Sequence, residues 1–271
     1  MSDEMKKRIV DYWTGRAESY SQLNREELAW GMNQDWLAAM ESEFPDRPKE
    51  RMRILDIGTG PGFLAILLAQ NGYFPDAADC TEEMLKEAES NAGQLKKRIR
   101  FHEMSADALD FPDGTFDVIV SRNLTWNLPE PCRCYEEWLR LLKPDGRVII
   151  FDANWYRYLF SEESRTAYSR DRDEVAARAI RDFNVGPNFG VMEDIALELP
   201  MSKKMRPQWD RDKLLELGYA QVELCEDIWK EVWTEEEKTN YQSTPMFRIT
   251  AYSSKTAMMA STTGSEYHVQ S

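Results

Sequence analysis

The stretch ILDIGTGPG, residues 54–62, decides the fold, because an apolar strand pattern runs directly into a glycine-rich turn. Glycines stand at positions 58, 60 and 62, and an apolar helical pattern, PGFLAILLAQNG, begins at residue 61. A glycine-rich turn between a strand and a helix lets a ligand approach the backbone closely. The stretch therefore predicts the first strand, turn and helix of a nucleotide-binding α/β domain.

Strand and helix patterns alternate downstream of this turn. We expect strands in YFPDAAD (73–79), RIRFHEM (98–104), TFDVIVSRN (115–123) and GRVIIFDAN (146–154), with helices between them in TEEMLKEAESNAGQL (81–95) and PEPCRCYEEWLRLL (129–142). The same alternation returns at 208–229 and ends in PMFRITAYS (245–253). Repeated βα units predict an α/β fold: a Rossmann-like, seven-stranded, mostly parallel sheet with helices on both faces.

Breaks in this pattern divide the chain into five parts. Residues 1–50 are expected to be helical, with Asn24 as the N-cap of the second of two helices. Residues 51–154 form the ligand-binding core, and residues 155–207 interrupt it as a cap inserted after the fifth strand. Residues 208–254 complete the sheet, and residues 255–271 form a small, polar tail. Because ligands bind at the carboxyl ends of such strands, the insertion is expected to cover a substrate.

Composition excludes several other classes of protein. The formal net charge of −14 argues against DNA as a partner, because nucleic-acid binding needs a basic footprint. No apolar run is long enough to span a membrane, and the amino terminus lacks a secretory signal, so a cytoplasmic location is expected. The four cysteines and two histidines form no metal-ligand pattern. The oligomeric state, monomer or homodimer, is left open.

Two aspartates indicate the kind of ligand. Asp56 stands two residues before the first glycine, where a carboxylate repels a pyrophosphate and attracts a cation. Phe63 replaces the third glycine of the dinucleotide pattern, and no lysine follows as in a phosphate-binding loop. Asp79 ends the next strand, where an acid can accept hydrogen bonds from ribose hydroxyls, although Asp76 competes for that role. S-adenosylmethionine fits this description, because it has a ribose and a positive charge but no phosphate.

Four segments in order, LDIGTGPG, DCTEEML, SADALDFPDGTFDVIVSRN and LLKPDGRVII, resemble the consecutive motifs of class I S-adenosylmethionine-dependent methyltransferases, type 11. The resemblance covers residues 50–155 and implies S-adenosylmethionine as cofactor. By position it implies that the cofactor-binding residues are Tyr12, Trp13, Tyr20, Asp56, Gly58, Thr59, Gly60, Asp79, Cys80, Met84, Asp107, Ala108 and Asn123. Within this set the glycine turn and Asn123 face the methionine part, whereas Asp107 and Ala108 face the adenine. The three aromatic residues of the amino-terminal segment are expected to close over the cofactor, or else simply to pack their helix.

The methyl acceptor is expected in an aromatic pocket. Trp126, Trp155, Tyr156 and Tyr241 are the candidate pocket residues, since aromatic rings stack on planar groups and bind cations. The acidic stretch CEDIWKEVWTEEEK (225–238) either attracts a cationic substrate or forms a solvated face, and the solvated face is the preferred interpretation. We expect an enzyme that methylates a small molecule. The alternatives are a methyltransferase acting on a protein or RNA, and a cofactor-binding protein without catalysis. No general base is indicated, because His102 lies on a strand away from the expected site.

Overall fold

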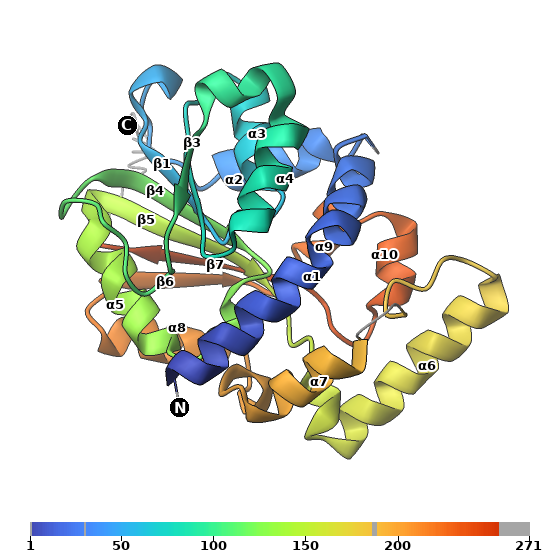
Figure 1. The fold of residues 1–271 in the computed structure, drawn as a ribbon. Helices are drawn as coiled ribbons and strands as arrows, with labels where there is room; N and C mark the ends of the chain where they lie inside the picture. The colour runs from blue at the N-terminus through green and yellow to red at the C-terminus, as the bar shows by residue number, and fades with distance from the viewer. Residues whose placement is uncertain (1, 30, 186–188, 255–271) are drawn as a thin grey trace, which may run out of the picture.

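The computed structural model describes residues 2–29, 31–185 and 189–254 of the 271-residue chain. Seven strands form one sheet in the order β3-β2-β1-β4-β5-β7-β6. The strands are β1 (Ile54–Ile57), β2 (Asp76–Asp79), β3 (Arg100–Glu103), β4 (Phe116–Arg122), β5 (Leu142–Asp152), β6 (Gln221–Cys225) and β7 (Phe247–Tyr252). All pairs are parallel except those that β7 makes with β5 and β6. The predicted Rossmann-like sheet is confirmed (Figure 1).

Side chains alternate along the central strands and build a core on each face of the sheet. Val118 and Val120 of β4 pack on one face, with α2 (Asn33–Glu41), α3 (Phe63–Gln70) and α9 (Trp229–Val232). Ile119, between them, points to the other face, where α5 (Pro131–Leu141) and α8 (Gln208–Glu216) cover the sheet. Consecutive apolar side chains of β4 are therefore buried on opposite faces of the sheet.

The amino-terminal segment contains one long helix and one short one. α1 spans Ser2–Ala29 and crosses the carboxyl edge of the sheet beside α4 (Glu82–Ala92) (Figure 1). The expected N-cap at Asn24 is wrong, because the first helix continues through that residue and α2 begins only at Asn33. The Asn24 side chain instead donates a hydrogen bond to Glu27, one turn further along the same helix.

The chain between β5 and α8 folds into two further helices, α6 (Glu162–Arg178) and α7 (Phe189–Glu198). α7 lies against α1, and the two helices form a small apolar cluster that includes Ile9, Met192 and Ile195 (Figure 1). α6 packs against α10 (Glu235–Asn240). The inserted segment thus packs against α1 and α10.

Within the described ranges, no helix combines the length and apolar character that crossing a membrane requires. The expected polar tail, residues 255–271, lies outside the part of the chain that the structure describes.

Candidate functional site

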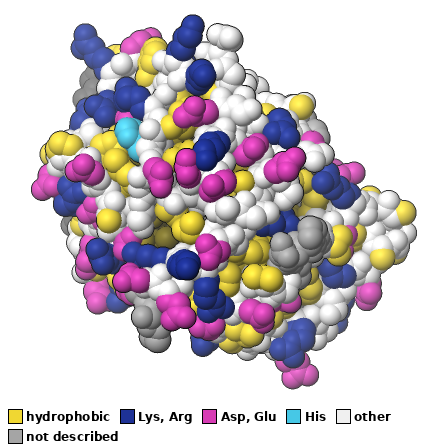
Figure 2. Space-filling model, viewed as in Figure 1, with side chains coloured by type: hydrophobic (Ala, Val, Ile, Leu, Met, Phe, Trp, Pro, Cys, Tyr) yellow, Lys and Arg dark blue, Asp and Glu magenta, His cyan; other side chains and the backbone are white. Residues whose placement is uncertain are grey.

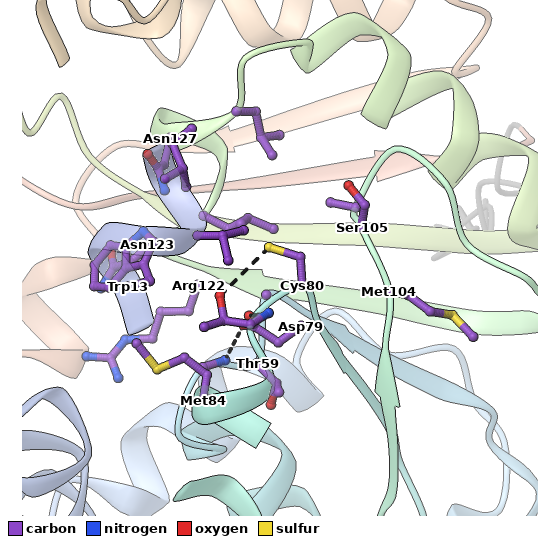
Figure 3. A pocket seen from close by; sticks show the side chains of 18 of the residues that line it. Trp13, Thr59, Asp79, Cys80, Met84, Met104, Ser105, Arg122, Asn123 and Asn127 are labelled. Atoms are coloured by element: carbon purple, nitrogen blue, oxygen red, sulfur yellow. Dashed lines mark hydrogen bonds between the residues drawn. The ribbon is translucent and has the colours of Figure 1, made fainter. Parts of the chain in front are cut away.

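A cavity of about 270 Å³ lies at the carboxyl ends of β1, β2 and β4, beneath α1. Residues from the ends of these strands line it, together with side chains from α1 and α4. Figure 3 shows Trp13, Arg122 and Asn123 at one end of the cavity and Met104 and Ser105 at the other. Figure 2 shows a hollow on this face of the molecule, with a hydrophobic floor and charged side chains around its rim.

The glycine turn has the conformation that its sequence requires. Gly58 has a φ of +65°, and a Cβ atom there would lie 2.7 Å from the Leu124 side chain. The backbone N–H groups of Gly58 and Thr59 donate hydrogen bonds to the Ala78 carbonyl oxygen, at 2.8 and 3.0 Å. The turn is therefore bound to the end of β2, and it leaves room for a ligand only because glycine has no side chain.

Asp79 lies in the cavity wall and holds the loops around it. Its Oδ2 accepts a hydrogen bond from the Gly60 N–H, and its Oδ1 accepts one from the Thr81 N–H, both at 2.9 Å. Asp76 does not line the cavity, because its buried carboxylate is bound by Arg53, Arg100 and His102. Of the two candidates for the ribose, only Asp79 faces the cavity.

Asp56 is 2% exposed and organises the start of α3. Its Oδ2 accepts hydrogen bonds from the Thr59 hydroxyl at 2.6 Å and from the Ala65 N–H at 3.1 Å. Burial raises the pKa of this carboxyl to about 7, and the neighbouring charge of Asp79 adds to the increase. A cationic ligand in the cavity would reverse this shift, because it stabilises the ionised carboxylate.

The other end of the cavity is built by the turn after β3. Cys80, Met84 and Asp107, three of the predicted cofactor-binding residues, all line the cavity. Asp107 already binds three groups: Lys6 of α1 and the Ser105 hydroxyl donate to its oxygens, each at 2.5 Å, and Arg133 Nε lies 3.4 Å from its Oδ2. Ala108 is exposed and does not line the cavity; Ser105 and Ala106 take that position.

Two buried acceptor atoms of this cavity have no hydrogen-bond partner among the described residues: Oδ1 of Asn123 and Oδ1 of Asn127. A buried acceptor without a donor is costly, so such atoms indicate a missing ligand. The ammonium group of S-adenosylmethionine is a hydrogen-bond donor that suits these acceptors. Together with the glycine turn and Asp79, these acceptors fit that cofactor.

A second cavity, of about 200 Å³, adjoins the first. Trp13, Tyr20, Arg122 and Asn123 line both cavities, so the two share a wall at one end of the first. Its lining is rich in aromatic rings: Tyr12, Trp13, Tyr20, Trp155, Tyr156, Phe183, Trp233 and Tyr241. Among the predicted pocket residues, Trp155, Tyr156 and Tyr241 line it. Tyr12 lines this cavity rather than the first one.

Trp126 lies behind the wall of the second cavity. It is 7% exposed and packs against Tyr156, with ring centroids 5.0 Å apart. Its indole N–H donates to the Asn123 carbonyl oxygen at 2.8 Å. Trp126 thus fixes the position of two lining residues without lining either cavity itself.

Charged residues in the second cavity were not singled out from the sequence. Arg122 at the end of β4 forms a two-pronged ion pair with Glu27 of α1, at 2.6 and 3.1 Å. Glu237 of α10 is 9% exposed and also lines the cavity. Glu237 belongs to the acidic stretch interpreted as a solvated face; Glu235 and Glu236 are indeed exposed, but the third glutamate faces inward. In the sequence, only the helical spacing within TEEEK could have distinguished Glu237 from its two exposed neighbours.

In the described ranges, no three histidine, cysteine or acidic side chains gather as metal ligands would. His102 lines neither cavity, and its Nε2 lies 2.9 Å from Asp76.

The strand order, the glycine turn and the acid at the end of β2 define a class I methyltransferase fold. Residues 55–150 match the family model described as a methyltransferase domain, of type 11. The uncharacterized methyltransferase YcgJ of Bacillus subtilis is 34% identical over 101 residues, 37% of this chain and 40% of that protein. A ubiquinone/menaquinone biosynthesis C-methyltransferase of Rickettsia massiliae is 27% identical over 192 residues, 68% of this chain and 71% of the relative.

Among solved structures, phosphoethanolamine N-methyltransferase 2 of Haemonchus contortus in complex with S-adenosyl-L-methionine has the same fold. The TM-score is 0.58 at 18% identity, over 83% of this chain and 53% of that one. Residues 55–150 therefore form a methyltransferase domain of type 11, and the chain has the class I methyltransferase fold. S-adenosylmethionine is the cofactor of this family.

Proposed function

We propose that this chain transfers the methyl group of S-adenosylmethionine to a small molecule held in the second cavity. The observation that carries the proposal is the shared wall: Trp13, Tyr20, Arg122 and Asn123 line both cavities. A cofactor with its adenine beside Asp107 and its methionine part beside the glycine turn would present its sulfonium near that wall. Methyl transfer needs the acceptor atom in line with the carbon–sulfur bond, so adjoining cavities supply what the reaction requires.

The second cavity supports a small acceptor rather than a protein or RNA. Its volume is about 200 Å³, and α1, the inserted segment and α10 all contribute to its walls. A small concave site lined by aromatic rings orients a small molecule, whereas a protein segment or an RNA strand needs a longer groove. Relatives such as the Rickettsia enzyme, named for ubiquinone and menaquinone biosynthesis, also act on small molecules.

In the proposed arrangement the chain mainly positions the two reactants. Asp79 binds the ribose, and Asn123 and Asn127 bind donors of the cofactor. The rings of Trp155, Tyr156 and Tyr241 hold the acceptor. The cofactor, when bound, supplies an activated methyl group.

Calorimetric titration tests the cofactor assignment first. S-adenosylmethionine and S-adenosylhomocysteine are expected to bind with micromolar affinity, and NAD is expected not to bind, because Asp56 beside the glycine turn repels its pyrophosphate. Tight NAD binding, or no binding of either sulfur compound, would contradict the proposal.

The acceptor site is tested with Trp155→Ala. Trp155 lines only the second cavity, so the variant is expected to keep S-adenosylmethionine affinity within about twofold and to lose most methyl transfer, since a ring contact is worth ~1 kcal/mol beyond its buried area. Trp229→Ala is the matched control, because Trp229 packs on Trp233 from outside, with centroids 6.2 Å apart, and lines neither cavity. Equal losses in both variants would indicate general damage to the aromatic cluster instead.

A further inference from the structure

We propose that the acceptor is an amine and that Glu237 is the carboxylate that receives its ammonium group in the second cavity. This inference rests on the methyl transfer proposed above and names the chemical class of its acceptor. It starts from a single buried acid for which the cofactor has no use, since Glu237 does not line the first cavity.

Glu237 is held rigidly by hydrogen bonds at the start of its helix. It is the third residue of α10, where its Oε2 accepts hydrogen bonds from the Thr234 N–H at 2.8 Å and the Thr234 hydroxyl at 2.9 Å. This reciprocal capping box fixes the side chain while leaving the other carboxylate oxygen uncommitted to the cap. Glutamine also serves at this position of a capping box, so the box alone does not require a charge.

Glu237 forms no direct ion pair with a described side chain, although the charge of Arg122 acts on it through space. Arg122 lies in the same cavity, but both of its terminal nitrogens bind Glu27. No lysine or arginine in the described ranges forms an ion pair with Glu237. Burial and the nearby charge of Glu27 raise the pKa of Glu237, whereas the Thr234 hydrogen bonds and Arg122 oppose the increase. Arg16, Tyr12, Tyr20, Tyr156 and Tyr241 are the other titratable side chains of the cavity. A buried carboxylate in this state is stabilised by an incoming cation.

Aromatic rings stand around the same position. Tyr241 lies 5.1 Å from Trp155 and 5.5 Å from Trp233, measured between ring centroids, and all three rings line the cavity. Glu237 acts on Tyr241 through space, and its charge is one cause, after burial, of the raised pKa of that phenol. Rings near a carboxylate form the usual recognition site for an ammonium group, because the faces of the rings attract a cation.

The same charge disfavours the other acceptor classes. A phenolate, a quinol anion or a carboxylate would bring a second negative charge next to Glu237 in a site shielded from water, where like charges repel strongly. A neutral alcohol would leave the carboxylate unpaired. Of these acceptor classes, only an amine, bound as an ammonium ion, pairs with the Glu237 carboxylate and offsets the free-energy cost of burying it.

Methyl transfer to the bound amine balances in atoms and charge when Glu237 accepts one proton. The bound ammonium group gives one proton to the Glu237 carboxylate and becomes a neutral amine. Its nitrogen lone pair then forms a bond to the methyl carbon, and the electron pair of the breaking carbon–sulfur bond goes to sulfur. The products are a methylated ammonium, S-adenosylhomocysteine and a protonated Glu237, which returns its proton to solvent when the product leaves.

Binding of three matched probes to the protein saturated with S-adenosylhomocysteine tests the inference by calorimetry. The probes are 2-phenylethylamine, 2-phenylethanol and phenylacetate, which share a ring and differ in charge. We expect the amine to bind at least about tenfold more tightly than the alcohol, and the carboxylate to bind least tightly. In Glu237→Gln the amine is expected to lose that advantage, because the capping box remains while the charge is removed.

Glu236→Gln is the matched control, since Glu236 precedes Glu237 on α10 and is exposed; its probe affinities should equal those of the parent protein. S-adenosylhomocysteine affinity is measured in each variant, so failure of the cofactor site is seen separately from failure of the amine preference. Equal or tighter binding of the alcohol or the carboxylate, or no binding of any probe to the saturated protein, overturns the inference. So does methylation of 1,4-naphthohydroquinone in preference to amines when S-adenosylhomocysteine release is assayed.

Discussion

Arg206 and Asp152 form an ion pair that is almost fully shielded from solvent, with 3.0 Å between Nη1 and Oδ2 and side chains 1% and 0% exposed. Asp152 ends β5, and Arg206 lies at the end of the inserted segment. Asp210 of α8 binds the same guanidinium at 2.8 and 3.1 Å. The other oxygen of Asp152 accepts a hydrogen bond from the Trp155 indole at 3.0 Å. One buried network therefore fastens the inserted segment to the sheet and orients a ring of the second cavity.

Replacing Arg206 with methionine is expected to lower the free energy of unfolding by about 3–5 kcal/mol, because two buried carboxylates lose their common partner. Denaturant unfolding followed by circular dichroism measures the change. Arg211→Met is the control: its exposed pair with Asp212 should contribute less than about 0.5 kcal/mol. Similar losses in both variants would refute the idea that the buried network carries this stability.

Asp79→Asn is expected to weaken S-adenosylmethionine binding about 10- to 100-fold, because hydrogen bonds to a charged acceptor contribute about 1.5–3 kcal/mol each. Titration calorimetry gives the affinity directly. Glu103→Gln provides the comparison, since Glu103 is paired with Asp79 in the sheet register but is exposed and lines neither cavity. Unchanged affinity in Asp79→Asn would remove the ribose role from this residue.

Gly58→Ala is expected to weaken cofactor binding about tenfold or more, because the new Cβ atom forces the Leu124 side chain, which lines the first cavity, out of its place. Gly72 is the matched control. It also has a positive φ, of +94°, but no atom lies within 4 Å of the place that a Cβ atom would take there. Gly72→Ala should therefore lose about 1–2 kcal/mol of stability from backbone strain without any change in cofactor affinity. A similar affinity in the two alanine variants would argue against the close approach at Gly58.

The sheet could be predicted from the sequence because its strands are short, apolar and separated by strong turn signals. ILDIGTGPG specifies a strand, a left-handed turn and a helix within nine residues, and each feature is local. The end of α1 was predicted less well than the sheet. Asn24 is a good N-cap residue, but the helix continues through it, since Glu27, one turn later, binds Arg122 across the site. Tertiary pairing overrides a local capping preference there.

The positions lining the cofactor cavity were predictable to the extent that they follow strand ends. Gly58, Asp79 and Asn123 each stand directly at or after the end of a strand, so topology alone brings them together. Glu237 could not be found this way, because it reaches the second cavity from a short helix far along the chain. Its inward direction depends on how α10 packs, which no local pattern reveals.

The affinity of the empty protein for S-adenosylmethionine is expected to rise with pH between 6 and 7.5, through the titration of Asp56. Burial raises the pKa of Asp56 to about 7, so this carboxyl is mostly protonated at pH 6 in the empty cavity. A cationic ligand favours the ionised form, which means that binding releases a proton. With a pKa near 7, affinity at pH 6 should be roughly tenfold weaker than at pH 7.5.

The raised pKa of Asp56 also affects folding. A higher pH raises the affinity for the cofactor, but it lowers the stability of the protein without cofactor. A carboxyl whose folded pKa lies above its unfolded value stabilises the empty protein at low pH, and that stability is lost as the pH rises from about 4 to about 7. Calorimetry in two buffers with different ionisation enthalpies measures the proton release on binding, and Asp56→Asn is the reference. Its amide oxygen can still accept hydrogen bonds from Thr59 and Ala65, but the side chain does not titrate. Proton release near pH 6.5 in the parent and its absence in Asp56→Asn are both required; a flat affinity across this pH range would show that Asp56 does not face the positive charge of the cofactor.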